Sequence, residues 1–365
     1  MRFICIFAGL VLLLSGCRTT GGPRAEKNKF EKLFSWNPPN DEEGADRCAQ
    51  AGVTDIVVHS QAQFDMMTKR GIRAYWKIFI PDGPYWQVMN DEETKHYNFI
   101  NGSDLDPKMP REERQQIINK RREDKSHRYG GEMITEIDTI NNARIKCFIS
   151  DEDFSYSKKR LDGILKDAPE GACGIFMDYN GYMNHNGCYC DACLRKYREY
   201  LADQQFEDSN EARKDFYLGQ LVDYYNKVID YVKKQRPDYK VVIHAYPDFK
   251  PEPLLGNRTK ADYCGQTVAW YFQWPKEKIQ RYTKFVVKHA KDYNKNAEGI
   301  PFLGINTNEK SSLGYKKPED VEREMKQILD AGGRTLMICD GRAIIEPGYF
   351  EVFRKYCGKE PTPEK

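Results

Sequence analysis

Apolar and polar positions alternate between two patterns along most of the chain. Short β-branched or aromatic runs predict buried strands, and apolar residues recurring every three or four positions predict helices. The helical pattern is clearest over residues 218–232 and 321–329. The predicted strands are residues 32–36, 53–59, 72–80, 174–178, 240–245, 266–272, 300–305 and 334–339.

Eight strands interleaved with helices predict an α/β fold, a (β/α)8 TIM barrel. A doubly wound open sheet is the alternative, but that fold favours a glycine-rich phosphate loop after its first strand, and none follows residue 36. Residues 85–155 are charged and lack a clear period, which predicts a long insertion after strand three. We assign the barrel to residues 30–358 and a disordered tail to residues 359–365.

The N-terminus carries a short apolar run, residues 3–14, that is too short to span a bilayer as a helix. It ends in Leu14-Ser15-Gly16-Cys17, which resembles the lipobox of bacterial lipoprotein signals. The resemblance implies a signal peptide over residues 1–17 and lipid modification of Cys17.

Residues 18–29 are polar and contain Gly and Pro, which predicts a flexible tether behind the anchor. We therefore expect an exported protein that is lipid-anchored to the bacterial cell envelope. In a Gram-negative cell, Arg18 in place of Asp resembles sorting to the outer membrane.

Charge and composition exclude several classes of function. The 57 Lys and Arg nearly cancel the 55 Asp and Glu, so a net charge of +2 provides no strong attraction to nucleic acid. A mean hydropathy of −0.76 excludes a polytopic membrane protein. An aromatic content of 13% excludes a disordered chain.

Polar and aromatic residues gather where the predicted strands end, which is where barrel enzymes place their catalytic groups. Carboxylates ringed by Trp and Tyr suit a sugar, because aromatic faces stack on its C–H surfaces and carboxylates handle protons and the oxocarbenium-like charge. The candidate catalytic residues are Asp178, Glu309, Asp340 and Asp248. The candidate substrate-binding residues are Trp36, His59, Tyr179, Asn180, His244, Tyr246, Trp270, Tyr271, Trp274 and Asn306.

The stretch after strand four carries a family resemblance. Asp178 is followed by Cys188-Tyr-Cys190-Asp-Ala-Cys193 and then by Tyr197-Arg-Glu-Tyr-Leu201. This pattern is similar to that of the family 42 β-galactosidases and related hypothetical glycoside hydrolases. The resemblance implies a catalytic carboxylate at the end of strand four. It also implies a structural zinc held by Cys188, Cys190, Cys193 and an upstream cysteine, for which Cys147 stands 41 residues before Cys188. No organic cofactor is expected.

A disulfide from Cys147 to one of the other three cysteines is the alternative to zinc, because the expected compartment is oxidising.

Two departures from the family leave the catalytic mechanism open. The family has Asn-Glu at the end of strand four, where this chain has Asp178, and a nucleophilic Glu at the end of strand seven, where this chain has Asn306 with Glu309 three residues on. Asp178 can instead be the nucleophile.

Three hypotheses follow. The first is a surface-anchored glycoside hydrolase-like protein that acts on poly- or oligosaccharide through paired carboxylates at the barrel mouth. The second is a non-catalytic carbohydrate-binding lipoprotein on the same barrel. The third is a metal-dependent hydrolase using His59, His244 and Asp178, although no His-x-His or His-Glu-x-x-His spacing supports it. The expected partners are a carbohydrate and, through the lipid anchor, a membrane.

Overall fold

The computed structural model describes residues 28–79, 85–123, 128–129, 132–133, 147, 151–180, 187–245, 258–271, 273–309 and 315–358 of the chain. The predicted signal peptide with Cys17, most of the tether and the predicted tail lie outside these residues, as do Tyr246 and Asp248. Within the described ranges, no helix combines the length and the apolar character needed to cross a membrane.

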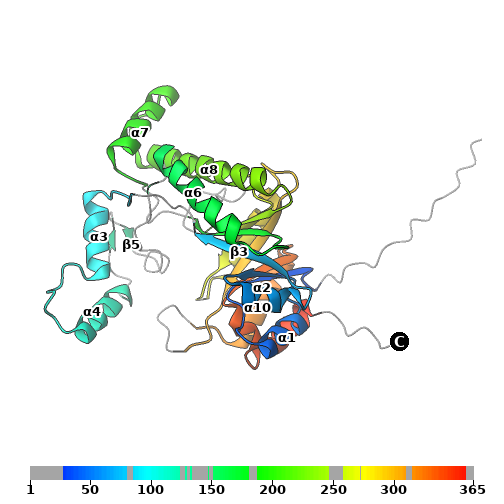
Figure 1. Cartoon of the computed structure of the whole chain (residues 1–365). Coiled ribbons are helices and arrows are strands. Elements are labelled where there is room, and N and C mark those ends of the chain that lie inside the picture. The colour runs from blue at the N-terminus through cyan, green and yellow to red at the C-terminus, as the bar shows by residue number, and fades with distance from the viewer. Residues whose placement is uncertain are drawn as a thin grey trace, which may run out of the picture.

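Eight parallel strands close into a barrel surrounded by helices (Figure 1). The predicted TIM barrel is therefore confirmed, and the open sheet is wrong. Strand order around the barrel follows the chain, as the βα repeat requires. The strands are β1 (Lys32–Ser35), β2 (Asp55–Val58), β3 (Arg73–Phe79), β6 (Gly174–Asn180), β7 (Lys240–Ala245), β8 (Tyr263–Ala269), β9 (Glu298–Gly304) and β10 (Thr335–Cys339).

Helices outside the barrel bury one apolar stripe each. In α10 (Pro318–Asp330), Pro occupies the first turn, and Val321, Met325 and Ile328 form the buried stripe. The other helices of this layer, together with one 3₁₀ turn, are α1 (Glu42–Gln50), α2 (Gln61–Thr68), α6 (Asp151–Asp167), α8 (Asn210–Gln235), α9 (Lys276–His289), η3 (Gly341–Ile345) and α11 (Tyr349–Cys357).

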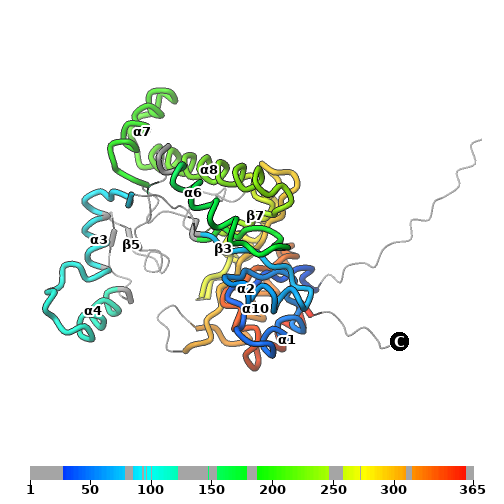
Figure 2. The backbone as a smooth tube through the Cα atoms, in the orientation of Figure 1, coloured from blue at the N-terminus to red at the C-terminus, as the bar shows by residue number. Residues whose placement is uncertain are grey.

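The polar stretch after β3 contains α3 (Asp91–Asn101), α4 (Arg111–Glu123) and a hairpin of β4 (Arg128–Tyr129) and β5 (Glu132–Met133). These elements lie to one side of the barrel (Figure 2). The two helices are joined by Arg121, which pairs with Asp104 and places its guanidinium over the ring of Phe99. Polar and cation–π contacts therefore help to join the described helices of the insertion.

Aromatic side chains fill the barrel interior in layers. Phe34, Tyr75 and Tyr263 form one layer, with 5.2 Å between the ring centroids of Phe34 and Tyr263. Trp36, the residue directly after β1, packs edge-on against Phe176, with 4.9 Å between the ring centroids. Every second residue along a strand faces the interior, so the next layer of side chains leads to the mouth.

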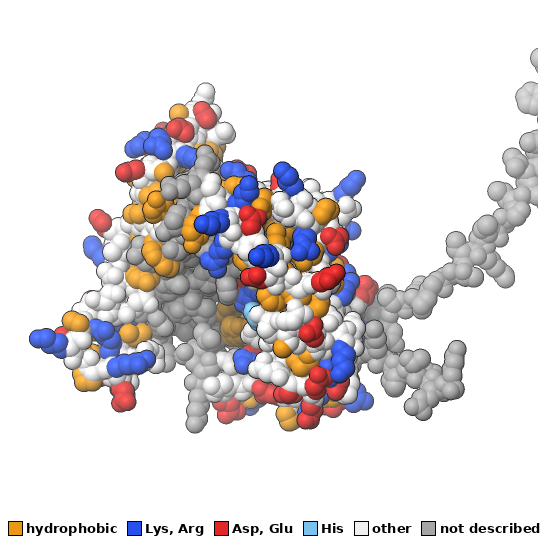
Figure 3. Space-filling view, viewed as in Figure 1, with side chains coloured by type: hydrophobic (Ala, Val, Ile, Leu, Met, Phe, Trp, Pro, Cys, Tyr) orange, Lys and Arg blue, Asp and Glu red, His pale blue; other side chains and the backbone are white. Residues whose placement is uncertain are grey.

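On the face in Figure 3, acidic and basic side chains are interspersed, as expected from the nearly neutral net charge.

Candidate functional site

The strands are parallel, so the residues at their C-terminal ends share one end of the barrel, as predicted. Asp178 and His244 lie within β6 and β7, and the other predicted residues follow their strands directly. These are Trp36 after β1, His59 after β2, Trp270 and Tyr271 after β8, Asn306 after β9 and Asp340 after β10. The side chains of Tyr179 and Asn180 lie outside the described part of the structure.

Asp178 is the centre of a buried polar network. Asp178 is only 3% exposed, although it lies at the mouth of the barrel. Lys77 Nζ lies 3.2 Å from Asp178 Oδ2, and His244 Nδ1 lies 3.4 Å from Oδ1. Lys77 reaches it because β3 pairs with β6 in a register that places Phe79 opposite Asp178. Sequence reasoning placed Lys77 near the end of strand three but did not include it among the candidate site residues. The available signal was a lysine inside the apolar run of strand three.

His244 holds Asp178 from the other side. Its Nε2 lies 3.0 Å from Thr267 Oγ1, and its ring packs on Phe302 with 4.1 Å between centroids. Full burial lowers the pKa of His244, although the neighbouring Asp178 opposes this shift. A neutral imidazole can donate from Nδ1 to Asp178 and accept the Thr267 hydroxyl at Nε2. Donors therefore meet both oxygens of the Asp178 carboxylate.

Trp36 completes this side of the mouth. Lys77 Nζ lies 4.9 Å from the centroid of the Trp36 ring, and the indole stands edge-on to His244. Trp36 is 7% exposed, and its Nε1 has no hydrogen-bond partner among the described residues. A buried donor of this kind is rare in folded proteins and suits a bound polar ligand.

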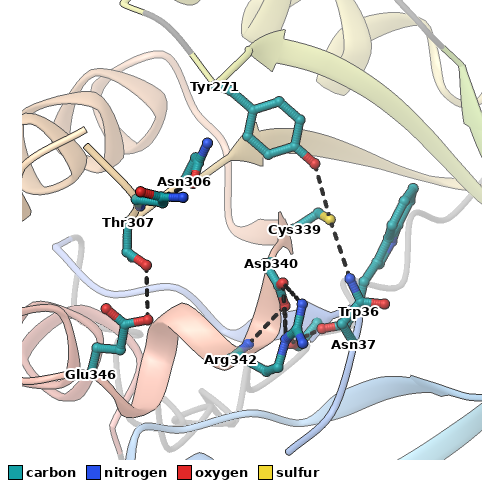
Figure 4. A network of polar contacts seen from close by, with 11 residues as sticks. Trp36, Asn37, Tyr271, Asn306, Thr307, Cys339, Asp340, Arg342 and Glu346 are labelled. Atoms are coloured by element: carbon teal, nitrogen blue, oxygen red, sulfur yellow. Dashed lines mark hydrogen bonds and ion pairs between the residues drawn. The ribbon is translucent and has the colours of Figure 1, made fainter. Parts of the chain in front are cut away.

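Asp340 lies on the β10 side of the mouth and is held by Arg342 (Figure 4). Its carboxylate accepts hydrogen bonds from the backbone N–H and from Nε of Arg342, both at 3.0 Å. Glu309 follows β9 and is exposed. Nearby, Thr307 donates to Glu346 at 2.8 Å, so the mouth carries a carboxylate at Glu346 that sequence reasoning missed.

Tyr271 and Cys339, from the ends of β8 and β10, contact each other at the mouth. The Tyr271 hydroxyl donates to Cys339 Sγ at 3.2 Å, as Figure 4 shows. Burial, together with the carboxylates of Asp340 and Asp178, raises the pKa of Cys339 to about 12, against the lowering effect of the Tyr271 hydrogen bond. Burial, the adjacent Cys339 and the same two carboxylates also raise the pKa of Tyr271. Cys339 is thus a buried thiol, and the carboxylates of Asp178 and Asp340 both influence its pKa.

Three predicted binding residues have other contacts. Trp274 is 8% exposed and packs against α9, with Lys278 Nζ 3.5 Å from its ring centroid. Asn306 caps a turn, because its Oδ1 accepts the backbone N–H of Asn308 at 3.0 Å. His59 is exposed at the rim, and partial burial, together with the charge of Lys77, lowers its pKa.

The four cysteines of the predicted zinc site meet in one cluster. The Sγ atoms of Cys147, Cys188, Cys190 and Cys193 all lie within 4.8 Å of one another. The Cys147–Cys193 and Cys190–Cys193 sulfur separations are 3.6 and 3.4 Å, and all four are free thiols. Thiolates at about 2.3 Å from a tetrahedral ion stand about 3.8 Å apart, whereas a disulfide requires about 2.05 Å. The cluster therefore fits a four-thiolate metal site better than the alternative disulfide.

The surroundings of the cluster also suit a metal. Three of the four sulfurs belong to buried residues, and the backbone N–H of Val88 donates to Cys188 Sγ at 3.3 Å. Gly187 is needed before Cys188, because its φ is +76° and a Cβ there would lie 2.2 Å from the Tyr217 ring. Among the described residues, His59, His244 and Asp178 do not form a comparable group of metal ligands.

No protein-family model and no curated protein matches the chain. Among solved structures, it is similar to the PgaB (BpsB) glycoside hydrolase domain from Bordetella bronchiseptica, with a TM-score of 0.55 and 10% identity over 91% of this chain and 100% of that one. It is also similar to Gan42B, a GH42 β-galactosidase from G. stearothermophilus, with a TM-score of 0.51 and 12% identity over 90% of this chain. Alpha-L-fucosidase isoenzyme 2 from Paenibacillus thiaminolyticus gives a TM-score of 0.50 and 11% identity over 90% of this chain.

The chain spans the whole of the Bordetella domain but only 56% and 49% of the other two chains. These neighbours are glycoside hydrolases, and at such identities the likeness shows a glycoside hydrolase-like fold. Two cavities of about 310 and 300 Å³ lie along α8, away from the strand ends, and share Gln220 and Asp223 in their walls. The chemistry of the mouth instead centres on Asp178.

Proposed function

We propose that the protein is a surface-anchored glycoside hydrolase that acts on a poly- or oligosaccharide, with Asp178 as its central catalytic group. The observation that carries the proposal is the Asp178 network: a buried carboxylate at the strand ends of a glycoside hydrolase-like barrel, held by Lys77 and His244 beside Trp36. The indole N–H of Trp36 would bind a sugar oxygen.

Asp178 suits the role of nucleophile. Lys77 and His244 contact its two oxygens from opposite sides, which holds the carboxyl group in one orientation. In a retaining reaction it would attack the anomeric carbon while an acid protonates the leaving oxygen, and water would then release the sugar. The two carboxyl groups would then stand about 5 Å apart.

The acid must come from a second carboxyl group. Asp340 also lies at the mouth, but its carboxylate is already engaged in an ion pair with Arg342. Glu309 is exposed and has no ion pair among the described residues, so it is accessible to a bound substrate. We therefore propose Glu309 as acid and base, with Asp340 orienting the sugar and Asp248 as a further candidate.

The test uses the full chain purified in detergent and a panel of aryl glycosides and polysaccharides. Asp178→Asn should lower turnover at least a hundredfold, because a group acting in the transition state accounts for a factor of about 10² or more. Glu309→Gln should lower kcat/KM for substrates with poor leaving groups but not for dinitrophenyl glycosides, whose departure needs no acid; kcat for the dinitrophenyl glycosides should still fall, because the base that activates water is lost. An Asp178→Asn variant that folds and keeps wild-type turnover would remove Asp178 from the mechanism.

A non-catalytic carbohydrate-binding protein is the second candidate. It is favoured by Asn306, which stands where the resembling family has its nucleophile and uses its side chain to cap a turn. Binding of a polysaccharide without turnover of any substrate in the panel would support it.

We also propose that the cysteine cluster holds one structural zinc and that Cys17 carries the lipid anchor to the cell envelope. Four thiolates fill a tetrahedral zinc and leave no open position for water, so the metal would stabilise the loops without taking part in catalysis. Cys17→Ala should move the protein from the membrane fraction to the soluble fraction. A variant that remains in the membrane fraction would argue against the lipid anchor.

A further inference from the structure

Residues 85–88, beside the cysteine cluster, present apolar side chains to solvent. Tyr85 is 54% exposed, Trp86 53% and Val88 44%, whereas Gln87 between them is fully buried. Large aromatic side chains are normally covered in folded proteins, so neighbouring exposed Tyr and Trp residues indicate a binding surface.

The cysteine cluster fixes this segment. The backbone N–H of Cys147 donates to the Tyr85 carbonyl at 2.9 Å, and that of Val88 donates to Cys188 Sγ at 3.3 Å. The Val88 carbonyl in turn accepts the N–H of Tyr189 at 2.8 Å. Gln87 reaches the carbonyl of Gly187 from its buried side chain. Such anchoring lowers the entropy lost when a ligand stacks on these side chains.

The segment follows β3, whose neighbour in the barrel, β6, carries Asp178. It follows β3 by a few residues, and Cys188 follows β6 in the same way. These two strands are neighbours in the barrel, with Phe79 opposite Asp178. A chain about six residues long reaches at most about 20 Å, so the segment begins within that distance of the end of β3.

We propose that Tyr85, Trp86 and Val88 form an outer carbohydrate-binding platform, on which the part of a polysaccharide chain that extends beyond the mouth stacks. This inference rests on the proposed function and adds a substrate class: a polymer that occupies several subsites, as opposed to a small glycoside. Flat aromatic faces bind the C–H surface of a sugar without reading its charge, which suits an uncharged stretch of chain.

A second copy of this chain is a poorer occupant. A fully buried aromatic side chain covers 150–250 Å², so this half-exposed trio offers roughly 250 Å². A stable protein interface needs about 800 Å² from each partner. A sugar unit is small enough for the platform to cover one face of it.

The test is affinity gel electrophoresis of the full chain in detergent, with soluble galactan, mannan, xylan or mixed-linkage glucan in the gel. The polymer that retards the wild type should bind Trp86→Ala about tenfold more weakly, which equals about 1.4 kcal/mol. Trp86→Phe should restore part of the affinity, and Tyr85→Ala should lose less. The matched control is Tyr293→Ala, because Tyr293 is 55% exposed but lies between α9 and β9, at the opposite end of the strands.

Equal retardation of wild type and Trp86→Ala would overturn the platform, as would a wild type that none of the four polymers retards. Sedimentation velocity supplies a further outcome: a wild-type dimer that Trp86→Ala converts to monomer would assign the surface to a second copy. Trp86-dependent binding without hydrolysis would sink the proposed enzyme and keep the platform. Hydrolysis by the wild type, together with unchanged binding by Trp86→Ala, would support the proposed enzyme and overturn the platform.

Discussion

Lys316 and Glu324 form a fully buried ion pair behind the loop that carries Asn306. Lys316 Nζ lies 2.6 Å from Glu324 Oε2, and it also donates to the carbonyl of Gly304, at the end of β9, at 3.0 Å. The two side chains are 0% and 1% exposed. Burial lowers the pKa of Lys316 and raises the pKa of Glu324, while their mutual attraction opposes both shifts. Each charge is therefore stable mainly because the other is present.

Lys316→Met should destabilise the barrel strongly. It leaves the Glu324 carboxylate buried without its cation, and Oε1 of that carboxylate already has no hydrogen bond among the described residues. Breaking one half of a buried pair costs about 3–5 kcal/mol. Unfolding entropy is about 2.1 cal/mol/K per residue, or about 0.7 kcal/mol/K for roughly 320 residues, so the melting temperature should fall by about 4–7 °C.

The double variant Lys316→Met with Glu324→Leu should recover most of that loss, because apolar residues can replace a buried pair at little cost. A deficit of about 1 kcal/mol should remain, since the Gly304 carbonyl loses its donor. Calorimetry and urea unfolding measure both variants, with Lys355→Met as control for the exposed pair with Glu322, worth under about 1 kcal/mol. A Lys316→Met variant within 1 kcal/mol of wild type, or a double variant less stable than the single one, would refute this reasoning.

Two further predictions concern the metal and acid stability. Cys193→Ser should lose about one equivalent of zinc per chain in metal analysis, while Cys173→Ser, outside the cluster, should keep it; equal metal contents would contradict the zinc site. Burial alone would raise the pKa of Asp262, but hydrogen bonds from Lys233, the Val241 N–H and Lys240 lower it below 3.8. Asp262 therefore stabilises the fold above that pH, and the stability gap between wild type and Asp262→Asn should close as pH falls below about 4; a gap that persists at pH 2 would contradict it.

The barrel was predictable because its strands are buried on both faces and so form nearly continuous apolar runs. The start of β8 was missed for a physical reason. The strand begins at Tyr263, before the predicted residue 266, and includes Gly265, which interrupts the apolar pattern. A Cβ at Gly265 would lie 2.7 Å from the carbonyl of Ile243, so close strand packing accounts for the glycine.

The helices of the insertion were not predictable from periodicity. Arg121 of α4 contacts α3 through an ion pair with Asp104 and a cation–π contact with Phe99. Contacts of this kind leave no apolar stripe in the sequence. Part of the candidate site could not be predicted from the sequence either. The positions of Asp178 and His244 followed from the strand ends, but the role of Lys77 depends on the register between β3 and β6, which no local pattern encodes.

The cysteine cluster connects the least self-sufficient part of the fold to the candidate site. Few of the described residues of the insertion are buried apolar ones, and regions of that kind open most easily. The cluster joins Cys147, within the insertion, to the loop after β6, and the segment at Tyr85–Val88 hydrogen-bonds to both. A metal there would therefore tie together the segments that follow β3 and β6, while the barrel keeps its own core. Its removal should loosen these segments and the platform before it unfolds the strands.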